Sequence, residues 1–196
     1  MAKARAISGL KPQALTSTNA RIIARTRLEE MEEWGRYAHD SQRSDELHNL
    51  RIAAKRLRYT LEIFLDVLPV ESSSVIEEVT QIQEELGALH DSDVLVALLS
   101  LCLAQPQQSE RQTDNQHAQA VKAQQQEGKH LIANVDLVTH LLDAHTAPTS
   151  AQRKGLERLL HDTQQQRKRQ YNAFREHWDA LQERDFQHEV LALLDV

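Results

Sequence analysis

The sequence predicts an all-α fold, an antiparallel bundle of about seven or eight helices in a single domain spanning residues 1–196. Residues that favour helix are abundant, whereas the chain has only five Gly, four Pro and 4% aromatic residues. Apolar residues recur every three or four positions through most of the sequence, which is the period of a helix that buries one face. Short segments with Pro, Ser, Asp or Gly separate these stretches and predict turns between antiparallel helices.

The N-terminal part of the chain predicts two helices. The first spans about residues 17–37 and buries an apolar stripe of Ala20, Ala24, Leu28 and Met31. Its N-cap candidates are Ser17, Thr18 and Asn19. The second helix runs from about residue 45 to residue 68 and is stopped by Pro69. Its cap candidates are Ser44 and Asp45.

Two further helices are predicted in the middle of the chain. One starts at the serines 72–74 and reaches a break or close-packing point at Gly87. The next segment, L-G-A-L-H-D-S-D-V, provides Asp91 or Ser92 as a cap for another helix at about residues 93–104. Residues 105–126 hold nine Gln, and we expect either a solvated helix or a mobile insert there.

The C-terminal part of the chain predicts three helices. Residues 129–145 place five apolar side chains on one face and end before Pro148. Residues 150–181 predict a long helix, and a short helix over residues 185–194 follows it. The apolar face of the long helix consists of Leu156, Leu159, Leu160, Phe174, Trp178 and Leu181.

Charge and cysteine content narrow the classes of function. The formal net charge of −6 argues against a general nucleic-acid binder, and we expect no specific DNA partner. Residues 1–68 carry twelve Lys/Arg against nine Asp/Glu, whereas residues 69–110 carry eight Asp/Glu and no Lys or Arg. The single cysteine, Cys102, excludes an internal disulfide and fits a reducing compartment. The longest apolar run, about eleven residues, is too short for a bilayer, so we expect a cytoplasmic protein without a membrane partner.

One segment, H-N-L-R-I-A-A-K-R-L-R at residues 48–58, carries a concentrated basic pattern. At 100° per residue its polar and apolar side chains fall on opposite faces of one helix. The polar face consists of His48, Arg51, Lys55, Arg58, Tyr59 and Glu62, with Arg56 adding charge at one edge. The apolar face consists of Leu50, Ala54, Leu57, Leu61, Phe64, Leu65 and Leu68.

The side chains of the polar face suit an anion. Arg and Lys bind phosphate oxygens well, and His48 adds a positive charge when mildly acidic pH protonates it. The pattern predicts an anion-binding face, although a solvated basic face has the same spacing.

Three smaller groups are candidates for the same role. Arg21 and Arg25 flank the apolar stripe of the first helix and belong to the predicted anion-binding set. Asp91 either caps a helix or pairs with an arginine of the second helix, which leaves His90 to donate to a ligand. On the long C-terminal helix, cations predict either a solvated side or a second positive stripe with a supporting role. Lys154, His161, Lys168 and Arg175 recur every seven residues, and Arg158 and Arg169 lie beside them.

The sequence offers little for catalysis or for a metal. Ten His are present, but no H-x-x-E, H-E-x-x-H or Cys/His cluster occurs, so we expect no metal and no cofactor. A nucleophile elbow and the glycine-rich phosphate loops are absent as well. Asp91 with Asp93 is the sole carboxylate pair that a metal-dependent phosphohydrolase could use. We therefore expect a binding protein rather than an enzyme.

Two motifs carry a resemblance to a known family. Residues 47–64, L-H-N-L-R-I-A-A-K-R-L-R-Y-T-L-E-I-F, and residues 86–94, L-G-A-L-H-D-S-D-V, resemble in order and separation the motifs of the CHAD family, the conserved-histidine α-helical domains. The later segment R-K-R-Q-Y-N-A-F-R-E-H-W-D-A-L is similar to the helix of such domains that bears Arg, Tyr and Trp. The resemblance covers most of the chain apart from the Gln-rich segment.

The resemblance implies an all-helical domain whose basic residues line a cavity and bind inorganic polyphosphate, without catalysis. By position it gives the anion-binding role to His48, Arg51, Lys55, Arg56, Arg58 and Tyr59, and it gives the place of the second motif to His90 and Asp91. The family is also associated with bacterial polyphosphate granules. Its members often contain two similar helical halves, whereas this chain shows one clear basic motif. The site is therefore either shallower or completed by a homodimer.

Two other functions use the same basic face. A helical protein-interaction module would bind an acidic partner, such as the acidic 69–110 segment of a second copy. An RNA-binding module would need aromatic rings for base stacking, and only Tyr59 lies near the basic face.

Overall fold

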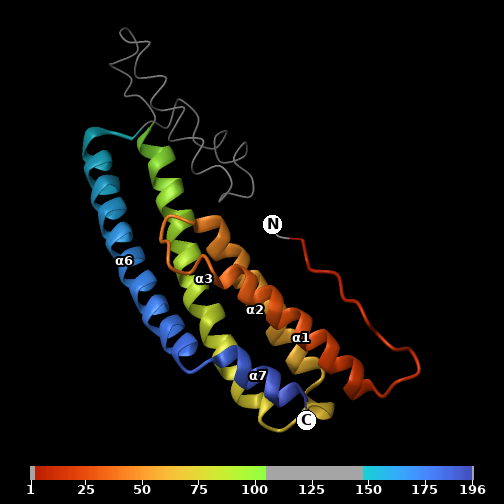
Figure 1. Ribbon diagram of the computed structural model, residues 1–196. Coiled ribbons are helices and arrows are strands. Elements are labelled where there is room, and N and C mark those ends of the chain that lie inside the picture. Colours follow the sequence, from red (N-terminus) through yellow and green to blue (C-terminus); the bar gives the residue numbers. More distant parts are fainter. Residues whose placement is uncertain (1–2, 105–147, 196) are drawn as a thin grey trace. The chain divides into compact units, whose positions relative to one another are not determined.

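The computed structural model describes residues 3–104 and 148–195, which contain five α-helices, one short 3-10 helix and no β-strand (Figure 1). The helices are α1 (Thr16–Gly35), α2 (Ser44–Ile63), η1 (Leu65–Val67), α3 (Ser72–Leu103), α6 (Ser150–Glu183) and α7 (Phe186–Asp195). The all-α prediction is confirmed, but the described residues do not match the predicted count of seven or eight helices. The predicted helix at 129–145 and the Gln-rich segment lie outside the described residues.

The chain divides into two compact units. The first consists of Met1–His90 and Gln170–Val196, and the second consists of Asp91–Arg169. The first unit therefore holds α1, α2, η1, α7, the N-terminal part of α3 and the C-terminal part of α6. The expectation of one domain stays a prediction.

Helix α1 begins one residue before the first predicted cap. Its N-cap position is Leu15, which makes no side-chain capping bond. Asn19, a predicted cap, instead bonds to the preceding loop: the Lys11 N–H donates to Asn19 Oδ1, and Asn19 Nδ2 donates to the Lys11 carbonyl, both at 2.9 Å. Asn19 therefore fixes the chain that enters α1 rather than the helix end itself.

Helix α2 ends earlier than predicted, and its last turn tightens. The α-helix stops at Ile63, and η1 carries the chain to Pro69. At the other end the N-cap position is Arg43 rather than Ser44, and Asp45 lies in the first turn, where its charge favours the helix dipole. The predicted apolar face is buried except at its C-terminal end, where Leu65 is 38% exposed because the chain has left the helix.

Helix α3 is one continuous helix of 32 residues, so of the two alternatives at Gly87 the break is wrong, whereas the close approach of Arg51 agrees with a close-packing point. Gly87 keeps a right-handed backbone, since Gly9 is the only described glycine with positive φ. Asp91 and Ser92 therefore lie inside a helix and do not cap one. Burial of Leu86 and Leu89 on either side of Gly87 keeps the helix running through that position.

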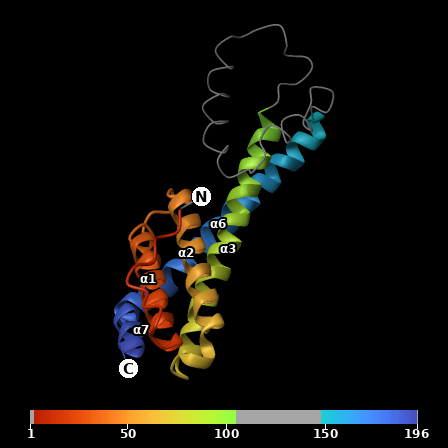
Figure 2. The same cartoon turned by 90° about the vertical axis from the view of Figure 1, so that its right-hand side faces the viewer.

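The core of the first unit is formed by all of its α-helices. Figure 2 shows α1 between α2 and α7, and α1 contacts both. The largest fully buried side chains of this core include Leu28, Met31, Leu50, Leu57, Leu61, Ile82, Phe174 and Leu181. Helix α6 contributes Phe174, Trp178 and Leu181 as predicted, and Asp185, with φ of 56°, turns the chain into α7.

The second unit joins the C-terminal part of α3 to the N-terminal part of α6. Asp93, whose side chain is 7% exposed, forms an ion pair with Arg167. Arg153 donates from both Nη atoms to the Leu103 carbonyl, at 2.9 and 2.8 Å, and so satisfies the C-terminal end of α3. Leu159, predicted as part of the apolar face of α6, is 47% exposed.

Helix α3 also has the length and composition of a membrane span. One 18-residue window reaches a mean hydropathy of 1.6, and a third of it is buried inside the structure. The window forms because α3 continues past the point at which the sequence predicts a break. Core helices of soluble proteins meet the same criterion, so this finding is weak evidence for a membrane protein.

Candidate anion-binding site

Helix α2 places its cations along one edge of a buried stripe. Its core side is fixed by burial of Leu50, Ala54, Leu57 and Leu61, each fully inaccessible to solvent. The helical period then puts His48, Arg51, Lys55 and Arg58 in one row beside that stripe. Lys55 is exposed, whereas the other three are partly buried. The row is thus held in place by packing behind it.

The N-terminal part of α3 lies against this row in the antiparallel direction. The rings of His48 and His90 have centroids 4.3 Å apart and an interplanar angle of 37°. One turn along, Arg51 lies beside Gly87, where an added Cβ would be 3.4 Å from Arg51 Nε. We call the facing edges of α2 and α3 the basic seam, defined by His48, Arg51, Lys55 and Arg58 of α2 with Gly87 and His90 of α3.

Two cations of the basic seam have no counter-ion among the described residues. Within the described part of the chain, Arg51 Nε is buried and makes no hydrogen bond, and Lys55 forms no ion pair. The charge of Arg58 is only weakly neutralised, because its Nε lies 3.6 Å from Glu62 Oε1. Elsewhere in the first unit, the arginines paired with carboxylates are Arg5, Arg25, Arg27, Arg43, Arg56, Arg175 and Arg184.

The ring of Tyr59 makes cation–π contacts with two of these cations. The Arg58 guanidinium lies 4.8 Å and the Lys55 ammonium 5.6 Å from the ring centroid. Contacts of this kind are attractive and restrict long side chains. Tyr59 therefore orients cations in the structure.

His48 is kept neutral by its surroundings. Burial, followed by the nearby His90 and Arg51, lowers the pKa of His48 below its ordinary value of 6.5. Its Nδ1 atom is buried and makes no hydrogen bond among the described residues. The imidazole can thus take up a proton when an anion arrives or when the pH falls.

Arg56, predicted to bind the anion, lies on the other edge of α2. It forms an ion pair with Glu30 of α1, whose side chain is 3% exposed and also accepts from Arg27 Nη1 at 2.7 Å. A buried carboxylate requires such partners, so Arg56 serves the α1–α2 contact. The prediction that Arg56 adds charge to the basic face is corrected. Sequence spacing could not reveal Glu30, because the partner lies 26 positions away on another helix.

Arg21 and Arg25, also predicted anion-binding residues, lie on the edge of α1 that faces α7. Arg25 forms an ion pair with Asp195 of α7, and Arg21 lies one turn earlier on the same edge. Glu32 on this edge has a raised pKa because of burial, and it bonds with Gln182 near the end of α6. The structure therefore does not bring Arg21 and Arg25 to the basic seam.

The predicted supporting residues belong to the second unit. Lys154, Arg158, His161 and Lys168 are exposed on α6, and Asp91 is exposed on α3. The carboxylate that binds an arginine there is Asp93, not Asp91. The supporting role of the α6 cations stays a prediction.

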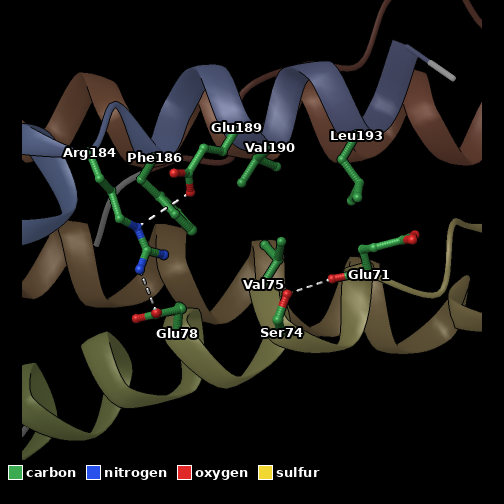
Figure 3. Close-up of a pocket in the computed structure, with 9 residues that line it drawn as sticks. All are labelled: Glu71, Ser74, Val75, Glu78, Arg184, Phe186, Glu189, Val190 and Leu193. Carbon is green, nitrogen blue, oxygen red and sulfur yellow. Dashed lines mark hydrogen bonds and ion pairs between the residues drawn. The ribbon is translucent and has the colours of Figure 1, made fainter.

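A separate pocket of about 300 Å³ lies between α3 and α7 (Figure 3). Arg184 bridges two of its carboxylates, at 3.0 Å to Glu78 and 3.3 Å to Glu189, and Glu71 lies at the other end. Val75, Phe186, Val190 and Leu193 form its apolar lining. Three carboxylates against one guanidinium disfavour an anion, so this pocket is distinct from the basic seam.

The described part of the chain holds no cluster of three or more His, Cys, Asp or Glu that could bind a metal ion. His48 and His90 lie together, but no carboxylate or thiol within residues 3–104 and 148–195 completes a ligand set with them. The chemistry that the basic seam supports is hydrogen bonding and charge pairing with an anion.

Comparison with known proteins adds the family. Residues 2–100, which include α1, α2 and most of α3, match the model of the CHAD domain. No curated protein and no solved structure matches the chain. CHAD domains are associated with polyphosphate binding and are generally non-catalytic. Because the matched segment covers half of the chain and contains the basic seam, the protein belongs to the CHAD domain family.

Proposed function

We propose that this protein binds inorganic polyphosphate at the basic seam and does not catalyse a reaction on it. The observation that carries the proposal is Arg51, whose buried Nε has no partner among the described residues, whereas Arg56 on the same helix is paired with Glu30. Membership of the CHAD family supports the same ligand class.

A bound anion would remove the free-energy cost of leaving the buried Arg51 donor without an acceptor. A buried donor without an acceptor is unfavourable by about 1–3 kcal/mol, and more when the group is charged. Phosphate oxygens accept several hydrogen bonds each and match the donors of guanidinium and ammonium groups. A phosphate at Arg51 and Lys55 would supply the missing acceptors and counter-charge together.

The length of the row favours a chain of phosphates over a single one. At 1.5 Å rise per residue, the ten steps from His48 to Arg58 span about 15 Å along α2. A single phosphate can meet only part of such a row, whereas a linear polyanion can meet every cation in turn. Binding then releases counterions and weakens steeply with salt.

The test is a titration with long-chain polyphosphate at two salt concentrations. The triple variant Arg51→Ala, Lys55→Ala, Arg58→Ala should lose binding and keep its helical circular dichroism. A matched variant, Arg5→Ala, Arg36→Ala, Arg43→Ala, removes the same charge from exposed positions outside the basic seam and should bind nearly normally. Equal affinities of the two variants would refute the proposed site.

Competition with RNA and an assay for released orthophosphate distinguish polyphosphate binding from the other functions. Single-stranded RNA should compete poorly, because the ring of Tyr59 beside the basic seam already contacts Lys55 and Arg58, and the rings of His48 and His90 pack on each other. Preferential binding of RNA, or release of orthophosphate with Mg²⁺, would contradict the proposal.

A further inference from the structure

Gln83 of α3 is a polar side chain that the sequence did not single out. It is partly buried, and its Oε1 atom is inaccessible to solvent and has no hydrogen-bond partner among the described residues. Buried amide oxygens are normally satisfied, so an exception calls for a physical reason.

The register of the basic seam places Gln83 opposite Lys55. His48 faces His90 and Arg51 faces Gly87, so three steps forward on α2 correspond to three steps back on α3. The next steps in this antiparallel register bring residue 55 opposite residue 83 and residue 58 opposite residue 80.

Burial along α3 agrees with this register. Val79, Ile82 and Leu86 point into the core of the first unit. The other edge of α3 faces α6, because His177 lies 2.9 Å from Glu85 Oε2 and 3.2 Å from Glu78 Oε2. The helical period therefore leaves Gln83 on the edge that faces α2.

The neighbouring polar residues on this edge of α3 already have hydrogen-bond or ring partners. Thr80 Oγ1 donates to the Ile76 carbonyl at 2.7 Å. Gly87 has no side chain, and His90 packs on His48. Gln83 is thus the side chain of this edge that still has both a donor group and an acceptor to offer.

We propose that Gln83 is a polyphosphate-binding residue of the basic seam, with its amide N–H groups donating to phosphate oxygens and its Oε1 accepting from the Lys55 ammonium. This inference rests on the proposed function. Polyphosphate provides acceptors and almost no donors, so the amide oxygen needs a donor from the protein, and Lys55 is the nearest cation by register. One amide then contacts the ligand and also positions a cation.

The charge of residue 83 matters as much as its hydrogen bonds. A carboxylate at this position would pair with Lys55 and repel phosphate. A neutral amide leaves the positive charge of Lys55 for the ligand. Gln83→Glu should therefore weaken binding more than Gln83→Ala does, although Glu has nearly the size of Gln.

The experiment compares Gln83→Ala with Gln81→Ala in titrations with long-chain polyphosphate. Gln81 is exposed, lies two positions away and donates to Glu85 Oε1 at 3.0 Å, on the side away from α2. Gln83→Ala should bind about tenfold more weakly, as expected for a lost hydrogen bond to a charged group, and Gln81→Ala should bind normally. Gln83→Leu, which keeps side-chain volume, guards against an effect of lost packing and should show the same loss.

The salt dependence gives a second measurement that a structural role would not reproduce. Because Gln83 is neutral, its removal should lower affinity at each salt concentration without changing the log–log slope. Lys55→Ala should reduce the slope by about 0.7–0.9, by analogy with nucleic acids. If wild type binds polyphosphate and Gln83→Ala and Gln83→Leu bind equally well, this inference is wrong and the proposed function stands. If wild type does not bind, both fail.

Discussion

Arg51 and Arg56 are five positions apart on one helix and have opposite surroundings. Arg56 lies at the α1 edge of α2 and neutralises Glu30, whose side chain is 3% exposed. Arg51 lies at the α3 edge, beside Gly87, with a buried Nε that has no partner among the described residues. One guanidinium therefore stabilises the fold, and the other is available to a ligand.

Replacing each arginine by Met should separate these roles. Arg56→Met should lower the free energy of unfolding by about 1–3 kcal/mol, because Glu30 loses a partner while remaining buried. Arg51→Met should leave that free energy unchanged or slightly higher and reduce polyphosphate affinity at least tenfold. Urea denaturation and titration of both variants provide the measurements. A large loss of stability in Arg51→Met would show that this guanidinium has a stabilising partner in the folded protein.

The pH dependence of His48 has a definite sign. Because burial lowers its pKa in the folded protein, the stabilising effect of the neutral imidazole is complete above pH 6.5 and is lost as the pH falls through the lowered pKa. Polyphosphate favours the protonated ring, so affinity should rise as the pH falls from 7.5 to 5.5. Titrations of wild type and His48→Gln at these pH values check this, since the variant should gain less. A gain of the same size in the variant would exclude His48 as the source.

At the scale of elements, periodicity predicts a helix more reliably than breakers predict its end. The apolar stripes of α1 and α2, and the part of the α6 stripe at Phe174, Trp178 and Leu181, follow the spacing in the sequence. The break at Gly87 fails because glycine and a following Asp-Ser pair end a helix only when the backbone leaves the right-handed region. Packing of Leu86 and Leu89 prevents that departure, and such packing cannot be read from the local sequence.

Gly35, the last residue of α1, is required for a helix contact. A Cβ at this position would lie 2.3 Å from Cζ2 of Trp178, a ring that is 2% exposed. Gly35→Ala should therefore cost about 1–3 kcal/mol of stability through overpacking. Gly155 in α6 has nothing within 4 Å of an added Cβ, so Gly155→Ala should stabilise by up to about 1 kcal/mol. Thermal denaturation of both variants checks the contrast, and similar melting temperatures would count against the Trp178 contact.

The candidate site was predictable to the extent that it lies on one helix. The row at His48, Arg51, Lys55 and Arg58 follows from spacing alone. Partners on other helices do not, so the sequence could not assign Arg56 to Glu30 or Arg25 to Asp195. The sequence does not distinguish Gln83 from the other glutamines, because only its burial and its neighbours in the folded protein set it apart.

For the whole molecule, net charge and binding preference need not agree. The chain carries a formal charge of −6, but the carboxylates and cations are unevenly distributed along it. The basic seam gathers cations at one edge of α2, whereas the pocket at Glu71, Glu78 and Glu189 gathers carboxylates. A polyanion responds to the local field, so a negative protein can still bind it.

Ligand binding should be visible as stability of the folded protein. At a polyphosphate concentration one hundred times the Kd, the folded state gains about 2.7 kcal/mol. For a chain of this size that corresponds to a rise in Tm of roughly 5–11 °C. The rise should be absent in the triple variant of the basic seam and with orthophosphate at equal phosphorus content. An equal rise with orthophosphate would indicate a general salt effect instead.

Replacing Gly87 to make this protein more heat-resistant should weaken its binding of the ligand. A glycine in the middle of a long helix is an obvious target, since alanine there improves helix propensity by about 1 kcal/mol. The new methyl group would sit 3.4 Å from Arg51 Nε and cover the guanidinium that we assign to phosphate. The engineered protein should melt later and hold its ligand less tightly, so a screen that scored melting alone would select against the activity.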